Sequence, residues 1–452
     1  MILAGTAYGT ASGRAGEYRI ANVPPGSYTF TVNYIGYEDY SIEITLAEDE
    51  SIIHDAALNV SYITMDEIIV QGLAQGQAKA LSQQKSAVNI TNIVSSDQIE
   101  RFPDPNIAEA LQRIPAISIQ RDHGEGRYVL IRGTEARLNS TMINGVRIPS
   151  PEDDNRNVSL DVIPSNLMQM VEVSKALTPD MDGDAIGGSV NLVTKNAFDY
   201  DGQILNLNLN GGYRNLRGDA GGQAAVTYAN QFMDGKLGFL VSGSYHSADM
   251  ATDNIELEWD EDEFNGSDET ILDDMQLRHY NLNRTRIGLT TSLNFKPNDQ
   301  SSYYLTGLYN NYTDMEDRNR LRFRFGKGDY DSPTEVSGAR MTRDLKHRKS
   351  VSIIQHIAAG GKHLFPKFEL DYTLSTSFAD EKRDPSKDIS FVQKKYDFKY
   401  DISDPDNPTV EVTNDLDYND LSGFKFDDME QKDGEYTFDR DRTFAINLKA
   451  PL

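Results

Sequence analysis

The stretch "IGLTTSLNF", residues 287–295, alternates strictly between two kinds of side chain. One set carries the bulk of the apolar character, and it comprises Ile287, Leu289, Thr291, Leu293 and Phe295. The other set is small or polar, and it comprises Gly288, Thr290, Ser292 and Asn294. A period of two places successive side chains on opposite faces of a strand. The stretches "ILNLNLN" (204–210) and "FELDYTLSTSF" (368–378) repeat the pattern, so residues 199–452 are predicted to be mainly β.

Two architectures produce such alternation, a soluble β-sandwich and a membrane-spanning barrel. The connections favour the barrel. Some are tight, such as "FMDGK" (232–236) and "FKPNDQ" (295–300), whereas residues 248–278 and 401–440 are predicted to be long acidic loops. Short turns at one rim and long loops at the other are typical of an outer-membrane barrel.

Composition excludes several classes of protein. Among 452 residues, 44 Lys plus Arg face 70 Asp plus Glu, and the net charge of −26 argues against nucleic-acid binding. The absence of cysteine excludes thiolate metal sites and disulfides. The sequence has no H-E-x-x-H, G-x-S-x-G or phosphate-binding loop motif, so we expect no enzyme activity and no cofactor.

The chain is predicted to divide into four parts. Residues 1–62 are expected to form a small, incomplete β-sandwich, with "NVPPG" (22–26) as a turn. Residues 63–80 form a soft linker, and residues 81–198 mix helix and strand signals. Residues 199–452 are the alternating β part. Within the mixed part, Asn106 or Asp104 is expected to cap a helix that Pro115 ends.

The mixed part contains the segments "AEALQRIP", "VLIRG", "MINGVRIPS" and "VEVSKALTPDMDGDAIGGSVNLVTK". These segments strongly resemble the plug domain of TonB-dependent outer-membrane receptors. The form "PDMDGDAIGG" resembles a subgroup linked to carbohydrate uptake, and residues 1–62 resemble a carboxypeptidase-regulatory-like module. The resemblance implies a small β-sandwich, an α+β plug, and the first part of an antiparallel transmembrane barrel of about 22 strands. Residues 199–452 suffice for eight to ten strands, so the chain is expected to be a fragment truncated at both ends, without its signal peptide.

The linker contains "MDEIIVQG", which resembles the TonB box of this family at Asp66, Glu67, Ile68, Ile69 and Val70. An extended segment on a flexible linker can add to the edge of a partner's sheet. The resemblance implies that TonB, driven by the ExbB–ExbD inner-membrane motor, pulls on this segment. The alternative is that the segment is the last strand of the small module.

The predicted ligand contacts are polar side chains at the apices of the plug. They are Arg121, Asp122, His123, Glu125, Arg127, Arg137, Asn139, Ser150, Asp153, Asp154, Asn155 and Arg156. For each of these residues the alternative is a solvated turn or a salt bridge to the barrel. The only tryptophan, Trp259, could stack on a sugar ring or pack within its own loop. Arg132 is expected to be a buried anchor between plug and barrel.

The predicted function is energy-coupled uptake of a bulky ligand across the outer membrane of a Gram-negative bacterium. An oligosaccharide is the first choice of ligand, with a ferric siderophore as the alternative. A non-transporting adhesin or porin is the alternative from another class. Outer-membrane lipid and a surface lipoprotein are the further partners expected. Asp180, Asp182 and Asp184 are spaced like calcium ligands, but Ala185 and Asn191 replace the Gly and Glu of an EF-hand, so no metal site is predicted.

Overall fold

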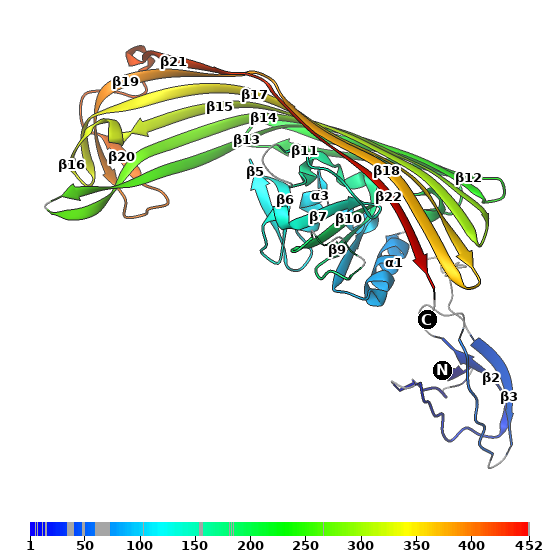
Figure 1. Ribbon diagram of the computed structural model, residues 1–452. Coiled ribbons are helices and arrows are strands. Elements are labelled where there is room, and N and C mark those ends of the chain that lie inside the picture. The colour runs from blue at the N-terminus through cyan, green and yellow to red at the C-terminus, as the bar shows by residue number, and fades with distance from the viewer. Residues whose placement is uncertain are drawn as a thin grey trace. The chain divides into compact units, whose positions relative to one another are not determined.

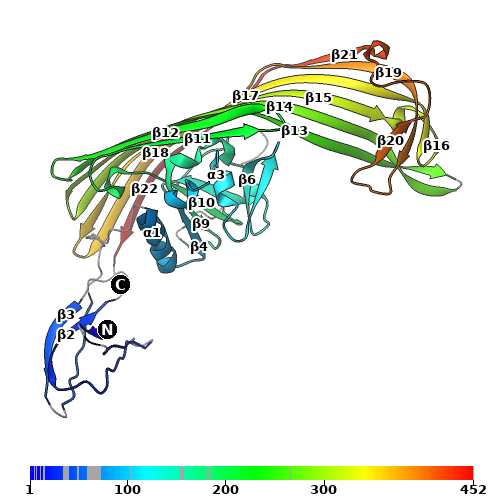
Figure 2. The same cartoon turned by 180° about the vertical axis from the view of Figure 1, so that it is seen from behind.

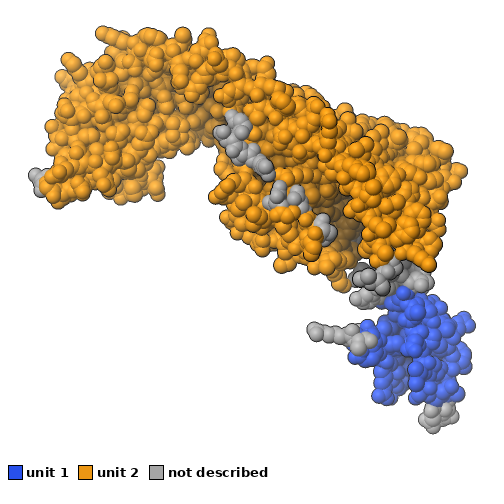
Figure 3. Space-filling view, viewed as in Figure 1, with its two compact units in different colours: residues 1–78 blue, residues 79–452 orange. Residues whose placement is uncertain are grey.

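The computed structural model describes residues 1–452 except residues 5, 7, 11, 14, 15, 34–39, 48, 49, 59–72, 103, 153–156, 180, 182, 184, 265, 451 and 452. The chain forms two compact units, residues 1–78 and residues 79–452, which Figure 3 draws in blue and orange. No helix in the described part is both long enough and apolar enough to cross a membrane. The predicted TonB box, Asp66 to Val70, lies outside the described residues.

The first unit contains one three-stranded antiparallel sheet in the order β1-β2-β3. Its strands are β1 (Ile2–Leu3), β2 (Gly26–Val32) and β3 (Tyr40–Leu46). Leu3, Phe30 and Val32 are buried, and side chains from segments outside the strands pack against them. This core accounts for the apolar alternation of "SYTFTV" along β2.

Residues 81–198 of the second unit are named the plug region after their sequence resemblance. Helix α1 (Leu73–Ser86) leads into it, and its other elements are β4 (Thr91–Ser95), α2 (Ser96–Ile99), α3 (Ile107–Leu111), β5 (Ile117–Asp122), β6 (Glu125–Ile131), η1 (Ala136–Leu138), β7 (Asn139–Ile143), β8 (Val146–Arg147), η2 (Leu160–Val162), η3 (Ser165–Leu167), β9 (Met168–Ser174), β10 (Gly188–Thr194) and η4 (Ala197–Asp199). Five strands form one sheet in the order β4-β9-β10-β7-β8, and β5 and β6 form a separate hairpin.

Local signals explain two features of the plug region. Asn106 caps α3, because its Oδ1 accepts a hydrogen bond from the Glu109 amide at 3.0 Å. The other candidate cap, Asp104, instead accepts from Arg113 at 2.8 Å. Asn144 and Gly145 have φ values of 49° and 79°, which fit the two-residue turn between β7 and β8.

Residues 204–449 form a twelve-stranded sheet, here named the wall sheet. Its elements are β11 (Ile204–Arg214), β12 (Asp219–Phe232), β13 (Leu237–Phe264), β14 (Ser267–Asn298), β15 (Ser301–Arg324), η5 (Phe325–Lys327), β16 (Asp329–Ser332), β17 (Glu335–Phe365), β18 (Phe368–Arg383), β19 (Ser386–Asp401), β20 (Thr409–Val412), η6 (Leu421–Gly423), β21 (Lys425–Lys432) and β22 (Glu435–Lys449). Eight strands follow one another in the order β11-β12-β13-β14-β15-β17-β18-β22, and the sheet is open among the described residues.

The plug region lies against one face of the wall sheet, here named the inner face (Figures 1 and 2). A single hydrophobic cluster joins the two, because Leu160, Val162 and Leu167 of the plug region share it with Leu308 and Tyr312 of β15. The alternation of β14 follows from this arrangement. Thr290 and Ser292 are buried on the inner face, whereas Leu289 and Leu293 are exposed on the outer face.

The outer face of the wall sheet is an apolar band bounded by aromatic rings. Near the tight turns, Tyr303 lies 6.3 Å from Phe295 and 5.3 Å from His363 between ring centroids. Toward the opposite end of the band, Tyr245 and Tyr309 are exposed. Exposed aliphatic side chains lie between the two aromatic levels, and they include Leu205, Leu207, Leu289, Leu293, Leu305, Ile357 and Leu374. Aromatic girdles around an apolar band are typical of membrane-spanning β-sheets.

The prediction that residues 248–278 form a long acidic loop is wrong. β13 and β14 continue through this segment as one hairpin, paired up to Phe264 opposite Ser267. Cross-strand partners stabilise it: His279 lies 2.7 Å from Asp253, and Arg278 pairs with Glu256. Residues 401–440, also predicted to be a loop, contain β20, β21 and the start of β22. Paired charges across strands therefore extend the sheet where the acidic composition suggested a loop.

Candidate functional site

The hairpin β5–β6 carries charged residues of the plug region to the inner face of the wall sheet. Its turn is formed by His123 and Gly124, whose φ values are 48° and 85°. Such left-handed values suit the two-residue turns that connect antiparallel strands. Asp122 and Glu125 flank the turn, and their carboxylates meet β14 of the wall.

Two fully buried arginines of β14 receive this hairpin. Arg284 donates to Glu125 at 2.7 Å and to Asp122 at 3.3 Å, and it also donates to Asp314 of β15 at 3.2 Å. Arg286 donates to the same Oε2 of Glu125 at 2.7 Å and, through Nε, to the Asp161 carbonyl oxygen at 2.6 Å. Buried charges are tolerated only when they are paired and hydrogen-bonded. This ion cluster therefore fixes the plug region to the wall by charge.

The pKa values of two acids in this cluster, Glu125 and Asp161, are shifted in opposite directions. Burial raises the pKa of Glu125, but Arg286 and Arg284 outweigh it and lower that pKa to about 2. Burial raises the pKa of Asp161 to about 6, although the positive charges of Arg127, Arg286 and Arg284 oppose the shift. The Asp161 Oδ1 atom has no hydrogen-bond partner among the described residues. The pKa of Glu125 thus lies below the usual range of a carboxyl group, and the pKa of Asp161 lies above it.

A second network holds the β6 strand to the following loop. Arg127 donates to Glu152 at 2.7 Å, and the Tyr128 hydroxyl donates to the same oxygen at 2.9 Å. The Ser159 hydroxyl also donates to Glu152. Glu152 therefore collects three donors. This network orders the chain on both sides of residues 153–156, which lie outside the described residues.

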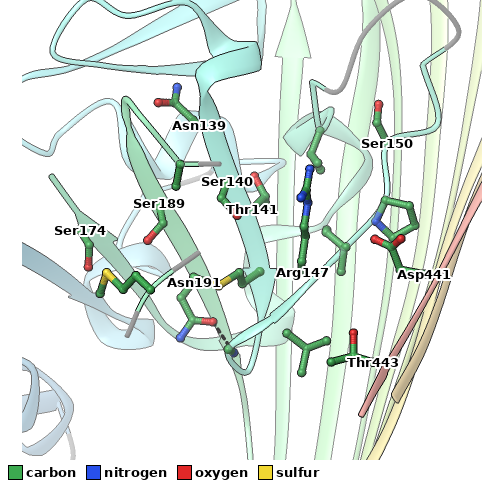
Figure 4. Close-up of a pocket in the computed structure, with 18 of the residues that line it drawn as sticks. Asn139, Ser140, Thr141, Arg147, Ser150, Ser174, Ser189, Asn191, Asp441 and Thr443 are labelled. Carbon is green, nitrogen blue, oxygen red and sulfur yellow. Dashed lines mark hydrogen bonds between the residues drawn. The ribbon is translucent and has the colours of Figure 1, made fainter. Parts of the chain in front are cut away.

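A polar cavity of about 800 Å³ lies between the plug region and β22 (Figure 4). β7, β8 and β10 line one side, and Asp441 and Thr443 of β22 line the other. Most polar groups around it are hydroxyls and amides, namely Asn139, Ser140, Thr141, Ser150, Ser174, Ser189, Asn191 and Thr443. The buried Ser140 hydroxyl has no hydrogen-bond partner among the described residues. Five charged side chains also line it, namely Arg147, Glu172, Asp439, Asp441 and Arg442, so the cavity offers donors, acceptors and both signs of charge to a polar ligand.

A row of arginines occupies the inner-facing positions of β15 beyond the plug region. Arg318, Arg320 and Arg322 form ion pairs with Asp388, Asp344 and Asp274 at 2.9, 2.6 and 2.7 Å. Arg324 has no ion pair among the described residues. A polar cavity of about 140 Å³ adjoins this row. The row is a second polar surface on the inner face.

Among the predicted ligand contacts, those on the β5–β6 hairpin lie in ion pairs. Asp122 and Glu125 face Arg284 and Arg286, and Arg127 faces Glu152. Arg121 donates to Glu109 at 2.7 Å within the plug region. The ring of His123 lies 4.4 Å from that of Tyr280 on β14. Asp122, His123 and Glu125 therefore lie at the plug-to-wall contact, whereas Arg121 and Arg127 form ion pairs within the plug region.

The remaining predicted contacts lie elsewhere. Asn139 and Ser150 line the 800 Å³ cavity. Arg137 is exposed and pairs with Glu135. Trp259 is 39% exposed and shares a face of β13 with Ile255 and Leu257, which is the outer face of the wall sheet. Asp153, Asp154, Asn155 and Arg156 lie outside the described residues.

Arg132 is not the buried anchor that the sequence suggested. It is exposed, has a φ of 55°, and donates to the Gly187 carbonyl oxygen at 3.3 Å within the plug region. The backbone turns at Arg132 and Gly133, where φ is positive in both residues. The arginines that join the two parts belong to the wall.

Sequence reasoning missed Arg284, Arg286, Glu152 and Asp161. A signal for the two arginines was present, because "RTRIG" places both on the small and polar face of the β14 alternation. The plug region covers this face of β14, and two charged side chains that become buried there need partners of opposite charge. Asp161 gave no such signal, since a single acid in "SLDVIP" is compatible with an exposed turn.

Comparisons with known protein families match two segments of the chain. Residues 82–189 match the family profile described as TonB-dependent Receptor Plug Domain. Residues 1–70 match the family described as CarboxypepD_reg-like domain. The first of these matches covers most of the plug region defined above, residues 81–198.

Relatives match short parts of the chain. The vitamin B12 transporter BtuB of Vibrio vulnificus is 28% identical over 152 residues, covering 33% of this chain and 25% of the relative. BtuB of Photobacterium profundum is 31% identical over 112 residues, covering 24% and 18%. The solved ferric enterobactin receptor PfeA of Pseudomonas aeruginosa is 12% identical with a TM-score of 0.37, covering 75% of this chain and 59% of that chain. The chain thus spans a quarter or less of the curated relatives.

The described residues contain no group of three His, Asp or Glu side chains placed to hold a metal ion. Asp180, Asp182 and Asp184, whose spacing raised the question of calcium, lie outside the described residues.

Proposed function

We propose that this protein is a TonB-dependent receptor of the outer membrane that takes up a bulky ligand by energy-coupled movement of its plug. The observation that carries the proposal is the plug itself, held by the buried ion cluster against the inner face of a sheet whose outer face is apolar. An adhesin or a passive porin would need neither a plug nor a coupling segment.

The ligand we favour is an oligosaccharide. Hydroxyl, amide and charged side chains line the 800 Å³ cavity beside the plug, and all three kinds of group pair well with sugar hydroxyls. A ferric siderophore is the second candidate. Its support is the arginine row on β15, where Arg324 lacks an ion pair among the described residues and could meet an anionic chelate.

The two ligand classes are separated by growth and uptake measurements in a Gram-negative host that carries the parent gene. Induction by a glycan, together with uptake of a labelled oligosaccharide, supports the first candidate. Induction by iron starvation and uptake of a labelled ferric siderophore would overturn it in favour of the second. If deletion of the gene leaves uptake of both the oligosaccharide and the ferric siderophore unchanged, the transport function is contradicted.

Energy coupling is tested at the proposed TonB box. Proline at position 69 removes a backbone donor and cannot join a strand ladder, so Ile69→Pro should abolish uptake while ligand binding to cells remains. Ile69→Val is the matched control, since it keeps the donor and the β-branched side chain. Normal uptake in the Ile69→Pro variant would show that this segment is not the coupling strand.

A further inference from the structure

A second large cavity, of about 890 Å³, lies on the outer face of the wall sheet beyond its apolar band. Its floor is a row of directly paired residues that crosses five strands, from β13 through β14, β15 and β17 to β19. The row consists of Ile255, Leu277, Leu321, Arg343 and Phe391, and it is here named the outer row. Four of these five side chains are apolar, and Arg343 is the exception.

The alternation of β14 and β15 places the outer row on the face away from the plug. On β14, Leu277 has the same parity as the exposed Leu289. On β15, Leu321 has the opposite parity to the buried Leu308, and the two strands pair without a shift over this whole length. The outer row therefore takes no part in the ion cluster or in the cavities of the inner face.

Polar side chains separate the outer row from the apolar band. The outward residues of β14 between Leu277 and Ile287 are His279, Asn281, Asn283 and Thr285. Ten residues of a strand tilted by about 40° rise by about 25 Å. With the apolar band in the proposed membrane location, the outer row lies outside the bilayer, and the acyl chains of membrane lipids do not cover it.

The loop around η6 forms a wall beside the outer row, and Leu421 and Phe424 line the cavity from this loop. The Nη2 atom of Arg343 donates to the Tyr418 carbonyl oxygen at 2.8 Å, and the guanidinium lies 5.3 Å from the centroid of the Phe424 ring. Leu421 remains 63% exposed and Leu345 remains 49% exposed. A partly enclosed groove with exposed leucines is typical of a site for an apolar ligand.

Arg343 is the charged side chain of this cavity that the protein leaves unpaired. The other five titratable side chains of the lining have partners, in the pairs His279–Asp253 at 2.7 Å, Arg320–Asp344 at 2.6 Å and Arg278–Glu256. Arg343 has no ion pair among the described residues, and its buried Nε atom has no hydrogen-bond partner there. Asp417 and Asp420 of the neighbouring loop accept hydrogen bonds from backbone amides of that loop. A buried donor without a partner is costly, so this guanidinium calls for an acceptor from outside the chain.

We infer that the outer row binds a free long-chain carboxylate, a molecule with one anionic group on an unbranched acyl chain. The carboxylate accepts from the Arg343 guanidinium, whose planar N–H groups match its two oxygens. A single negative charge balances the single unpaired cation. The acyl chain lies along Leu321, Leu277 and Ile255, three strand spacings or about 14 Å, which suits dodecanoate. Only the position outside the bilayer depends on the proposed membrane location.

The test measures the binding of radiolabelled dodecanoate to the full chain in lipid nanodiscs, by equilibrium dialysis, with empty nanodiscs as the background. We expect saturable binding that Arg343→Gln weakens at least tenfold, because a charge-assisted hydrogen bond is lost. The matched control Arg340→Gln removes an arginine from the other face of the same strand and should change affinity less than twofold.

Comparisons between ligands use the unmodified protein, so they remain decisive if a variant does not fold. Dodecanol lacks the charge, and butyrate lacks most of the chain, so each should bind at least tenfold more weakly than dodecanoate. Acetate at 10 mM should not displace dodecanoate, because the outer row gains most of its affinity from the apolar chain.

Equal binding by the Arg343→Gln and Arg340→Gln variants, or equal binding of dodecanoate and dodecanol, would overturn the inference, since Arg343 would then have no role. Displacement by acetate would also overturn it, because the cavity would then be a site for a small anion. In the same nanodiscs, a nitroxide-labelled lipid should quench a bimane probe at Leu289→Cys. Loss of that quenching contradicts the membrane location alone, and the dodecanoate measurements still decide whether the outer row is a binding site.

Discussion

At Glu125 one carboxylate lies between two guanidinium groups that are themselves buried. Replacing it with glutamine leaves Arg284 and Arg286 with one compensating charge fewer. Breaking a buried pair in this way costs about 3–5 kcal/mol. We therefore expect Glu125→Gln to lower the free energy of opening of the plug by a similar amount, measured by hydrogen exchange of the plug amides.

The matched control for this prediction is Glu135→Gln. Glu135 pairs with Arg137 in the same domain, but both side chains are exposed. Water replaces an exposed partner at little cost, so this variant should exchange like the unmodified protein. Equal protection in the two variants would show that the ion cluster does not hold the plug to the wall.

Asp161 makes the stability of the contact between the plug and the wall sheet depend on pH. Its pKa is about 6 in the folded protein and about 3.9 in an unfolded chain, so the folded state binds the proton more tightly. Its contribution to stability is complete below pH 3.9 and is lost as the pH rises through 6. Two pKa units correspond to roughly 3 kcal/mol.

Asn at position 161 cannot ionise, so the Asp161→Asn variant should not lose this stability as the pH rises. The stability of the variant relative to the unmodified protein should rise by roughly 3 kcal/mol between pH 3.5 and pH 7.5, in urea titrations of the plug. Glu125, with its low pKa, loses stability only as the pH falls below about 4.3, and it does so in both proteins. If the difference in stability between the variant and the unmodified protein is the same at all pH values, the titration does not belong to Asp161.

At the scale of elements, β14 approaches the plug most closely at Gly288. A Cβ atom there would clash with the Leu167 side chain and lie 3.0 Å from Pro164 Cγ. Gly288→Ala should therefore push η3 away from the wall and destabilise the contact by about 1–3 kcal/mol. The measurement is the protection of the η3 and β9 amides against hydrogen exchange.

Gly243→Ala on the neighbouring strand β13 is the control. A Cβ at Gly243 would meet its nearest atoms at 4.0 Å, which is ordinary contact. This variant should leave the protection unchanged or slightly increased, because alanine loses less backbone entropy on folding. A loss of protection as large as that of Gly288→Ala would mean that close approach is not the reason for glycine at position 288.

The sequence predicted elements well wherever one physical rule decided them. Alternation identified parts of β11, β14 and β18 in the wall, since each has one face on the side of the plug region and one facing outward. It failed at residues 248–278, because strand continuation there depends on partners such as His279 for Asp253, which composition does not reveal. The partners of the candidate site residues were not predicted for the same reason. Asp122 and Glu125 were visible as polar apices, but their partners Arg284 and Arg286 lie more than 150 residues away.

For the whole molecule, the central claim is that one face of the wall sheet meets lipid and the other meets the plug. The coupling mechanism depends on it. The chain has no cysteine, so single cysteines can be introduced as unique attachment points for a fluorophore. Leu289 and Ser292 are suitable positions, because they lie three residues apart on opposite faces of β14.

The most direct measurement is the quenching of a bimane probe at each of these two positions by nitroxide-labelled lipid in a reconstituted bilayer. We predict strong quenching at Leu289→Cys and little at Ser292→Cys, with the same contrast between Leu293→Cys and Thr290→Cys. Equal quenching on both faces, or quenching on neither, would contradict a sheet that separates lipid from plug.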